Sequence, residues 1–272
     1  MHTHDTVLKL WKKRHYGPDA QAEQDLARID KAVKPAHKYA LNAKLMATPA
    51  ATDLNRKFRL DSDGFGLSAL LQEISNYDPR LFIELRTKFC RFFPQFKSVR
   101  VESEMALQRA YDGVGNVAGS SRAVGNAIYF ETKTGESIRA QQASDGATLF
   151  LGFLALAHLP KPPNLLLIEE PENGIYPKRL GEVVKMLKEM VHRSEGAPFP
   201  QIILSTHSPY VLSFFEPEEV TFLSRPADDP KGPVRARPLR DAPGIKERLA
   251  GGEFYLGELW YNLSEKDLFG EP

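Results

Sequence analysis

Acidic, imidazole and hydroxyl side chains occur at three points of this 272-residue chain where they could act on a phosphate or a metal ion. Glu169 and Glu170 directly follow the apolar run 165–168. His207 stands in Ser-Thr-His-Ser-Pro, after the apolar residues 202–204. Carboxylates bind divalent cations and accept protons, and an imidazole donates a hydrogen bond or orients water. These groups are therefore the first candidates for a site.

The paired carboxylates need a partner. Two ionised carboxylates on consecutive residues at the mouth of a sheet are costly to hold unless a cation or a proton offsets their charge. In P-loop ATPases such a strand is the Walker B element, whose acid holds Mg²⁺ while a neighbouring carboxylate polarises the attacking water. On this interpretation Glu169 serves Mg²⁺ and Glu170 is the general base. The alternative is an acidic strand end that is solvated or caps the next helix.

A third group lies upstream, where Ser144, Asp145 and Gly146 precede the apolar segment 147–158. Ser144 is a good N-cap, and the first turn of a helix presents free N–H groups and partial positive charge. This helix start could bind phosphate, although by itself an ordinary helix cap explains the same residues.

The elements around the first two groups form a predicted βαβ unit. An unbroken apolar run such as 165–168 is typical of a strand buried on both faces of a parallel sheet. Residues 178–193 place their apolar side chains on one helical stripe, and 201–205 reads as a second buried strand. A right-handed crossover then places the carboxyl ends of both strands on one edge, where open α/β sheets bind ligands.

The rest of the chain divides into two further segments. Residues 1–38 are polar and predict a helix or an irregular entry, without identifiable chemistry. Residues 39–95 predict a helical insertion with one buried apolar face, which Pro94 ends. From 96 to about 265, alternating patterns predict short strands and a hairpin before the βαβ unit, and the Gly/Ser-rich segment 112–121 predicts a loop.

Composition limits the possible environments. The formal net charge is +1, with 36 basic and 35 acidic residues, so no global field attracts nucleic acid or an anionic membrane. The single cysteine, Cys90, excludes an internal disulfide and a cysteine-based zinc site. No segment reaches the ~20 apolar residues of a membrane span. We therefore expect a cytoplasmic protein without a membrane partner.

The order of the three groups is specific. Ser-Asp-Gly before a helix, an apolar run with Glu-Glu-Pro-Glu-Asn-Gly-Ile-Tyr-Pro, and then Ser-Thr-His-Ser-Pro together resemble the ABC-class ATPases of the AAA-labelled group. These are relatives of the RecF and structural-maintenance-of-chromosomes ATPases and of the overcoming-lysogenization-defect nucleases. The resemblance covers roughly residues 39–261. It implies a P-loop NTPase-like α/β fold, with a parallel sheet, helices on both faces and a helical insertion.

The resemblance also implies a head domain that dimerises around ATP and Mg²⁺. Ser144, Asp145 and Gly146 match the signature motif, and Glu169 and Glu170 match Walker B and its catalytic glutamate. Asn173 falls in the dimer-contact loop, and His207 matches the switch histidine. These roles make Glu170 and His207 catalytic, Glu169 a metal ligand, and the signature residues with Asn173 nucleotide contacts.

One departure from the family concerns mechanism. The sequence contains no Gly-x-x-x-x-Gly-Lys-Ser/Thr string, the Walker A loop that cradles the β and γ phosphates. We therefore expect the N-terminal lobe to come from a missing segment or from a partner, and the chain to be inactive alone. Without that lobe, an apolar strand edge would be an association liability. A homodimer or a partner ATPase subunit, with DNA or a nuclease effector in repair or anti-phage defence, follows by family analogy.

Two other functions stay open from the sequence. In a metal-dependent nuclease or phosphoesterase, Glu169, Glu170, Glu172 and His207 would bind divalent ions directly, which requires a further acidic cluster at the same edge. In a non-catalytic regulatory subunit, the helix that begins at Ser144 would act in trans on the nucleotide of a partner.

Overall fold

A computed structural model gives the fold, and it describes residues 24, 27–28, 36–113, 115–191, 201–225, 232–250, 255–262 and 265–269. The chain divides into two compact units. The first comprises Met1–Ile175 and Met186–Ser205, and the second comprises Tyr176–Lys185 and Thr206–Pro272.

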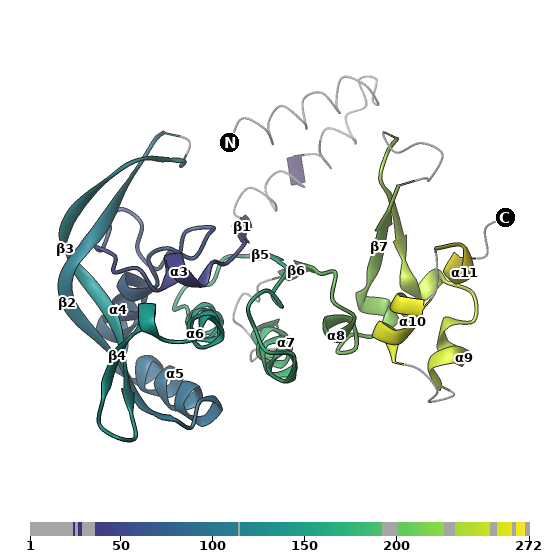
Figure 1. Cartoon of the computed structure of the whole chain (residues 1–272). Coiled ribbons are helices and arrows are strands. Elements are labelled where there is room, and N and C mark those ends of the chain that lie inside the picture. Colours follow the sequence, from purple (N-terminus) through teal and green to yellow (C-terminus); the bar gives the residue numbers. More distant parts are fainter. Residues whose placement is uncertain are drawn as a thin grey trace. The chain divides into compact units, whose positions relative to one another are not determined.

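The first unit contains a parallel sheet, a long hairpin and several helices (Figure 1). Its elements in chain order are β1 (Ala36–Tyr39), α3 (Ala43–Met46), α4 (Leu67–Tyr77), α5 (Pro79–Phe92), β2 (Phe96–Tyr111), β3 (Val117–Thr132), β4 (Ser137–Arg139), α6 (Asp145–Ala157), β5 (Leu165–Glu169) and β6 (Gln201–Ser205). Helix α7 (Pro177–Val191) connects β5 to β6; it begins in the second unit and ends in the first.

The parallel sheet has the strand order β1-β5-β6. Tyr39 pairs with Ile168, and Glu169 pairs with Ser205 at the end of the ladder. The predicted βαβ unit, an α/β fold with a parallel sheet, is therefore confirmed. Strand β1 was not predicted, because four residues are too few to show a period of two. The expected boundary between residues 38 and 39 falls inside this strand.

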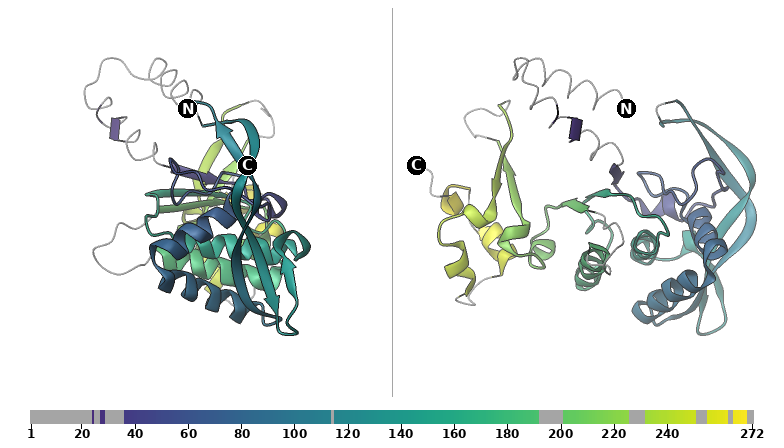
Figure 2. Two further views of the ribbon diagram at one scale, coloured as in Figure 1. Left: turned by 90° about the vertical axis from the view of Figure 1, so that its left-hand side faces the viewer. Right: turned by 180° about the vertical axis from the view of Figure 1, so that it is seen from behind.

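The two faces of this sheet differ. Tyr39, Leu166 and Ile168 are buried on one face, along which α6 lies (Figures 1 and 2). The other face, which we call the open face because Ile203 on it is 53% exposed, also carries the half-buried Leu167 and, at the start of β5, the buried Leu165. Helix α6 is buried over 147–157, since the sheet and other helices surround it.

The hairpin of β2 and β3 pairs two 16-residue strands, which is longer than the short strands that the alternation predicts. Val117 and the small residues after it belong to β3, so the expected loop is confined to the turn around Gly115. At the base of the hairpin, the Phe89 ring of α5 stacks on Phe130, with 5.2 Å between ring centroids, and on Phe96 at 5.9 Å. This aromatic cluster fixes α5 against the hairpin, as its predicted apolar stripe requires.

A partly buried ionic network ties the hairpin to the segment that follows β1. Asp61 accepts hydrogen bonds from Arg109 (2.8 Å), Arg56 (3.0 Å) and the Tyr111 hydroxyl (2.7 Å). Burial and the adjacent Asp61 carboxylate raise the pKa of Tyr111. The Ala40 N–H donates to the carbonyl oxygen of Ser62 at 2.7 Å, so the turn that contains Asp61 also holds the end of β1.

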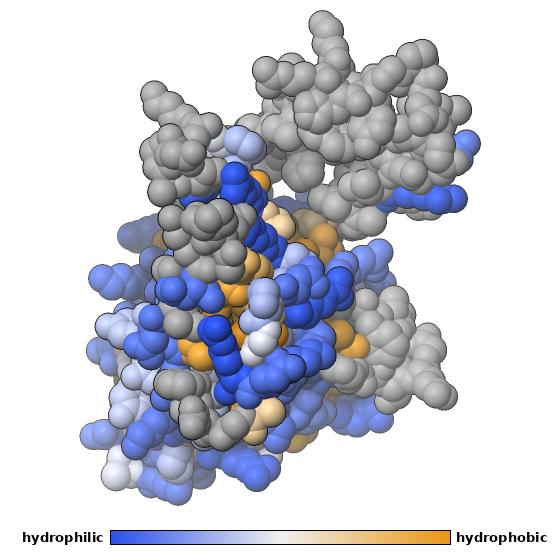
Figure 3. Space-filling model, turned by 90° about the vertical axis from the view of Figure 1, so that its right-hand side faces the viewer, coloured by the Kyte–Doolittle hydropathy of each residue, from blue (hydrophilic) through white to orange (hydrophobic). Residues whose placement is uncertain are grey.

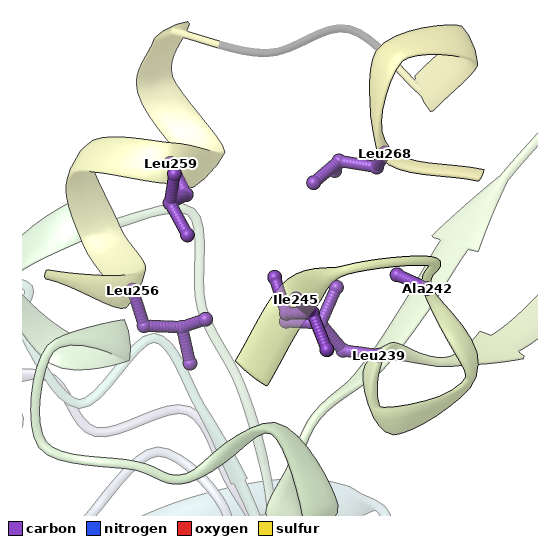
Figure 4. Close-up of a cluster of buried hydrophobic side chains, with 6 residues drawn as sticks. All are labelled: Leu239, Ala242, Ile245, Leu256, Leu259 and Leu268. Atoms are coloured by element: carbon purple, nitrogen blue, oxygen red, sulfur yellow. The ribbon is translucent and has the colours of Figure 1, made fainter. Parts of the chain in front are cut away.

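The second unit is smaller and has its own core. Its elements are α8 (Pro209–Leu212), β7 (Thr221–Ser224), β8 (Arg235–Pro238), α9 (Ile245–Ala250), α10 (Leu256–Asn262) and α11 (Glu265–Phe269). Figure 4 shows the buried cluster formed by Leu239, Ala242, Ile245, Leu256, Leu259 and Leu268. On the face in Figure 3, hydrophobic residues appear as small areas between hydrophilic ones.

Helices α3, α4 and α5 fall inside the expected helical insertion 39–95, which also contains a long non-helical stretch between Ala47 and Gly66. The division into 1–38, 39–95 and 96–265 stays a prediction. None of the helices in the described ranges has the length and apolar character that a membrane span requires.

Replacement of Asp61 by Asn should lower the free energy of unfolding by about 1–3 kcal/mol, because the half-buried Arg56 loses its carboxylate partner and Arg109 keeps only Asp63, at 2.9 Å. Urea unfolding followed by circular dichroism measures this. Lys88→Gln is the control, since the Glu84–Lys88 pair is exposed and its loss should cost at most about 0.5 kcal/mol. Equal losses in both variants would contradict a structural role of the Asp61 network.

Candidate functional site

Glu169 is the last residue of β5, and its side chain lies on the open face of the sheet. It shares this face with Leu167, two residues earlier, because side chains alternate along a strand. Its Oε1 atom lies 2.7 Å from Nζ of Lys38, and the two side chains are 46% and 57% exposed. Glu169 therefore presents an accessible carboxylate that already has a cationic neighbour.

Glu170 leaves the strand in an unusual backbone conformation. Its φ is +43°, in the left-handed region that side chains other than glycine rarely adopt. Its N–H donates to the Ser205 carbonyl oxygen at 2.9 Å, so the contact with β6 extends one residue past the ladder. Strain of this kind is kept only where the surrounding structure fixes it, and it is common at functional sites.

Asn173 fixes the Glu170 carboxylate within the same loop. The Asn173 side-chain Nδ2 donates to Oε2 of Glu170 at 2.6 Å, and the Asn173 N–H donates to the Glu170 carbonyl at 3.0 Å. Sequence reasoning assigned Asn173 to nucleotide or dimer contact. The structure places it against the candidate general base of its own chain, where its amide donor holds one carboxylate oxygen in place.

The loop after β5 packs on the start of α6. A Cβ atom at Gly146 would lie 3.2 Å from the Gly174 carbonyl oxygen, and one at Gly174 would lie 2.7 Å from Cδ1 of Leu149. Gly174 also has a φ of +80°, which favours glycine. The start of α6, with Gly146, and the loop that follows the paired glutamates, with Gly174, are thus in direct contact. The order of the residues in the sequence does not reveal this contact.

Ser144 caps α6 as predicted. Its Oγ atom accepts a hydrogen bond from the Ala147 N–H at 3.3 Å, and Asp145 follows in the first turn. Both side chains are exposed. The helix start therefore combines a formed cap with access from solvent, and its role as a nucleotide contact stays a prediction.

His207 belongs to the second unit and follows Ser205 by two residues. Its side chain is exposed, and the neighbouring Thr206 Oγ1 accepts a hydrogen bond from the Ser208 N–H at 2.9 Å. The β5–β6 ladder therefore brings the chain before His207 to the backbone of Glu170. The orientation of the imidazole toward that carboxylate stays a prediction.

The donor set at the edge fits Mg²⁺ bound together with phosphate. Mg²⁺ usually takes one or two protein carboxylates and completes its shell with phosphate oxygens and water. The exposed Glu169 carboxylate can supply such a ligand. The described ranges hold no group of three or more acidic, histidine or cysteine side chains that could bind a metal by themselves.

Lys38 is the residue at this edge that sequence reasoning missed. It lies in β1, opposite Leu167, and reaches Glu169 along the open face. The signal was weak, because the run from Ala36 to Tyr39 is only four residues long and mixes aromatic residues with small and polar ones. It lies inside the segment that composition marks as a polar N-terminal region.

Comparisons with known proteins place these features in context. The family model described as "AAA domain, putative AbiEii toxin, Type IV TA system" matches residues 22–213, more than half of the chain. A solved structure titled "Crystal structure of the SmcHead bound to the C-winged helix domain of ScpA" is similar at 14% identity and a TM-score of 0.41. The match covers 67% of this chain and 51% of that one, so this chain spans about half its length. No curated protein matches.

Replacement of Gly174 by Ala should lower the free energy of unfolding by about 1–3 kcal/mol, because the new methyl group overlaps Leu149 and the backbone keeps its positive φ. Gly135→Ala is the matched control, since Gly135 has a φ of +89° but no heavy atom within 4 Å of an added Cβ. The difference between the two variants in urea unfolding gives the packing contribution. Equal costs would show that the loop does not depend on its contact with α6.

Proposed function

The chain belongs to the AAA-domain family that matches it, and on that premise we propose that it binds ATP with Mg²⁺ and serves ATP hydrolysis. The observation that carries the proposal is the end of β5, where Glu169 and Glu170 meet the end of β6 through the Glu170–Ser205 hydrogen bond. This is the sheet edge at which α/β folds bind ligands. The family supports nucleotide binding, and the individual roles are our assignment.

Each acidic residue has a separate role in this proposal. Glu169 supplies a carboxylate to Mg²⁺, which when bound neutralises charge on the phosphate oxygens. Glu170 accepts a proton from the attacking water at a carboxylate oxygen, while Asn173 holds Oε2 in place. His207 donates a hydrogen bond to a phosphate oxygen or orients the water.

The start of α6 would contact the nucleotide of a second ATPase subunit. Its exposed first turn carries Ser144 and Asp145, and the N–H groups of a helix start favour an anion. The loop around Gly174 packs beside it, so a partner that touches one also comes close to the other. A homodimer or a related subunit would fit this arrangement.

A lobe with a Walker A loop is needed to complete the site, because the sequence contains no such loop. In the described ranges β6 pairs with β5 alone, so its other edge has no strand partner among those residues. We assign this edge to the lobe that grips the phosphates, supplied by another segment or by a partner chain. DNA and a nuclease effector, in repair or anti-phage defence, are the targets that family analogy favours.

Replacement of Glu170 by Gln should leave ATP bound but reduce turnover about 10²- to 10⁴-fold, since the variant keeps the shape and loses the base. The measurement pairs nucleotide binding with phosphate release, in the chain supplied with a Walker A lobe. Glu189→Gln is the control, because Glu189 is an exposed residue of α7 and undergoes the same change of charge. Unchanged hydrolysis by the Glu170 variant would refute the assigned base.

A binding experiment tests the need for the lobe. The purified chain should bind ATP only weakly by isothermal titration, because the groups that cradle the β and γ phosphates are absent from its sequence. Tight binding of ATP by the monomeric chain would contradict this part of the proposal.

A further inference from the structure

His158 is buried where α6 ends. Its side chain is 2% exposed, and its backbone N–H closes the last turn by donating to the Leu154 and Ala155 carbonyl oxygens. The ring nitrogen Nδ1 lies 2.7 Å from the same Leu154 oxygen. Because a carbonyl oxygen only accepts hydrogen bonds, Nδ1 carries a proton, and Nε2 is the ring nitrogen that gains or loses one.

Glu84 of α5 faces that second ring nitrogen. Its Oε1 atom lies 3.5 Å from Nε2 of His158, where α5 packs on α6. In the neutral ring Nε2 carries a lone pair, so two acceptors face each other. A proton on Nε2 makes it a charged donor, and the same contact becomes an ion pair. Burial opposes this charge, whereas the carboxylate and the carbonyl oxygens at the end of α6 favour it.

The same oxygen of Glu84 has a second cationic neighbour. Nζ of Lys88, one turn further along α5, lies 2.8 Å from Oε1, and the side chains of Lys88 and Glu84 are 44% and 53% exposed. This ammonium group, with a smaller contribution from His158, lowers the pKa of Glu84, so the carboxylate is ionised near neutral pH. One carboxylate oxygen therefore lies between a surface ammonium group and a buried imidazole.

Other charged side chains lie on the helices that pack against α6 and at its two ends: Lys44 on α3, Glu73 on α4, Arg80, Arg86 and Arg91 on α5, Asp145 in the first turn of α6, and Lys161 in the loop that follows it. Asp145 is at the opposite end of the helix, and the Glu73 carboxylate accepts a hydrogen bond from the Phe58 N–H. Glu84 supplies the carboxylate contact to His158 and shares it with Lys88.

We propose that Glu84 is shared between Lys88 and His158 and that a proton on His158 draws the carboxylate from the surface to the end of α6. Histidine ordinarily titrates near a pH of about 6.5, so the exchange falls within the physiological range. It makes the contact between the helical insertion and the helix that begins at Ser144 sensitive to pH. These residues lie outside the proposed nucleotide contacts, so the inference is independent of the proposed function.

The test follows the ring of His158 by NMR titration of the full chain. Glu84→Gln should lower the midpoint of this titration by about 0.2–0.7 pH units, the range for loss of one partly exposed ion pair. Lys88→Met should raise the midpoint by a similar amount, because it frees the carboxylate from its competitor. In the Glu84→Gln background Lys88→Met should have less than half that effect. Both side chains are about half-exposed, so the variants should fold as wild type does.

Lys44→Met is the matched control, because Lys44 is an exposed lysine of α3, another helix that packs on α6. The substitution removes the same charge and should leave the midpoint of the His158 titration unchanged. His37 in β1 is an internal reference, since its own titration should be the same in all of these variants.

Three results would overturn the inference. Equal midpoints in wild type and Glu84→Gln would show that the carboxylate does not stabilise the imidazolium. A rise in Lys88→Met that is the same with and without Glu84 would reflect repulsion between two cations and not a shared carboxylate. An equal rise in Lys44→Met and Lys88→Met would reflect net charge alone. A rise in Lys88→Met that depends on Glu84 and is absent from Lys44→Met supports the exchange.

Discussion

The way in which β5 ends governs the candidate site. Consecutive side chains of a strand point to opposite faces, so two neighbouring glutamates in a continuous strand could not serve one ligand. Here the backbone turns at Glu170, with a φ of +43°, while its N–H remains bonded to Ser205 of β6. Glu169 thus stays on the open face beside Lys38, and Glu170 is directed into the loop that Asn173 closes. The turn of the backbone therefore separates the two carboxylates. Glu169 pairs with Lys38, and Glu170 accepts a hydrogen bond from Asn173.

The surrounding elements fix this geometry from two sides. On one side, β1 adds a strand to β5 and is itself held by the turn that contains Asp61. On the other side, the loop after β5 rests on α6 through Gly146 and Gly174, where an added Cβ would be tight at Gly146 and would overlap Leu149 at Gly174. The loop is therefore set by packing against a buried helix as well as by its own hydrogen bonds.

The sequence predicts the elements with long, strong patterns and misses those without. The apolar run before Glu169 and the stripe of α7 identify the βαβ unit correctly, and membership of an AAA-type ATPase family is confirmed. The four residues of β1 have no readable period, and their strand character comes from pairing with β5. The contact between Gly146 and Gly174 and the bond from Asn173 to Glu170 depend on tertiary structure and on one backbone angle. Local propensity carries no information about either of them.

The path of α7 between the two units bears on how the chain folds during synthesis. The segment Tyr176–Lys185, which covers the start of α7 and the residue before it, belongs to the second unit, whereas Met186–Ser205 returns to the first. Domains generally fold as they leave the ribosome, the N-terminal one first. Here the first unit cannot be completed until β6 has emerged, and by then ten residues of the second unit have already been made. The parallel sheet of the first unit therefore stays incomplete while residues 176–185 are synthesised, and these residues are made before the rest of the second unit, against which they pack.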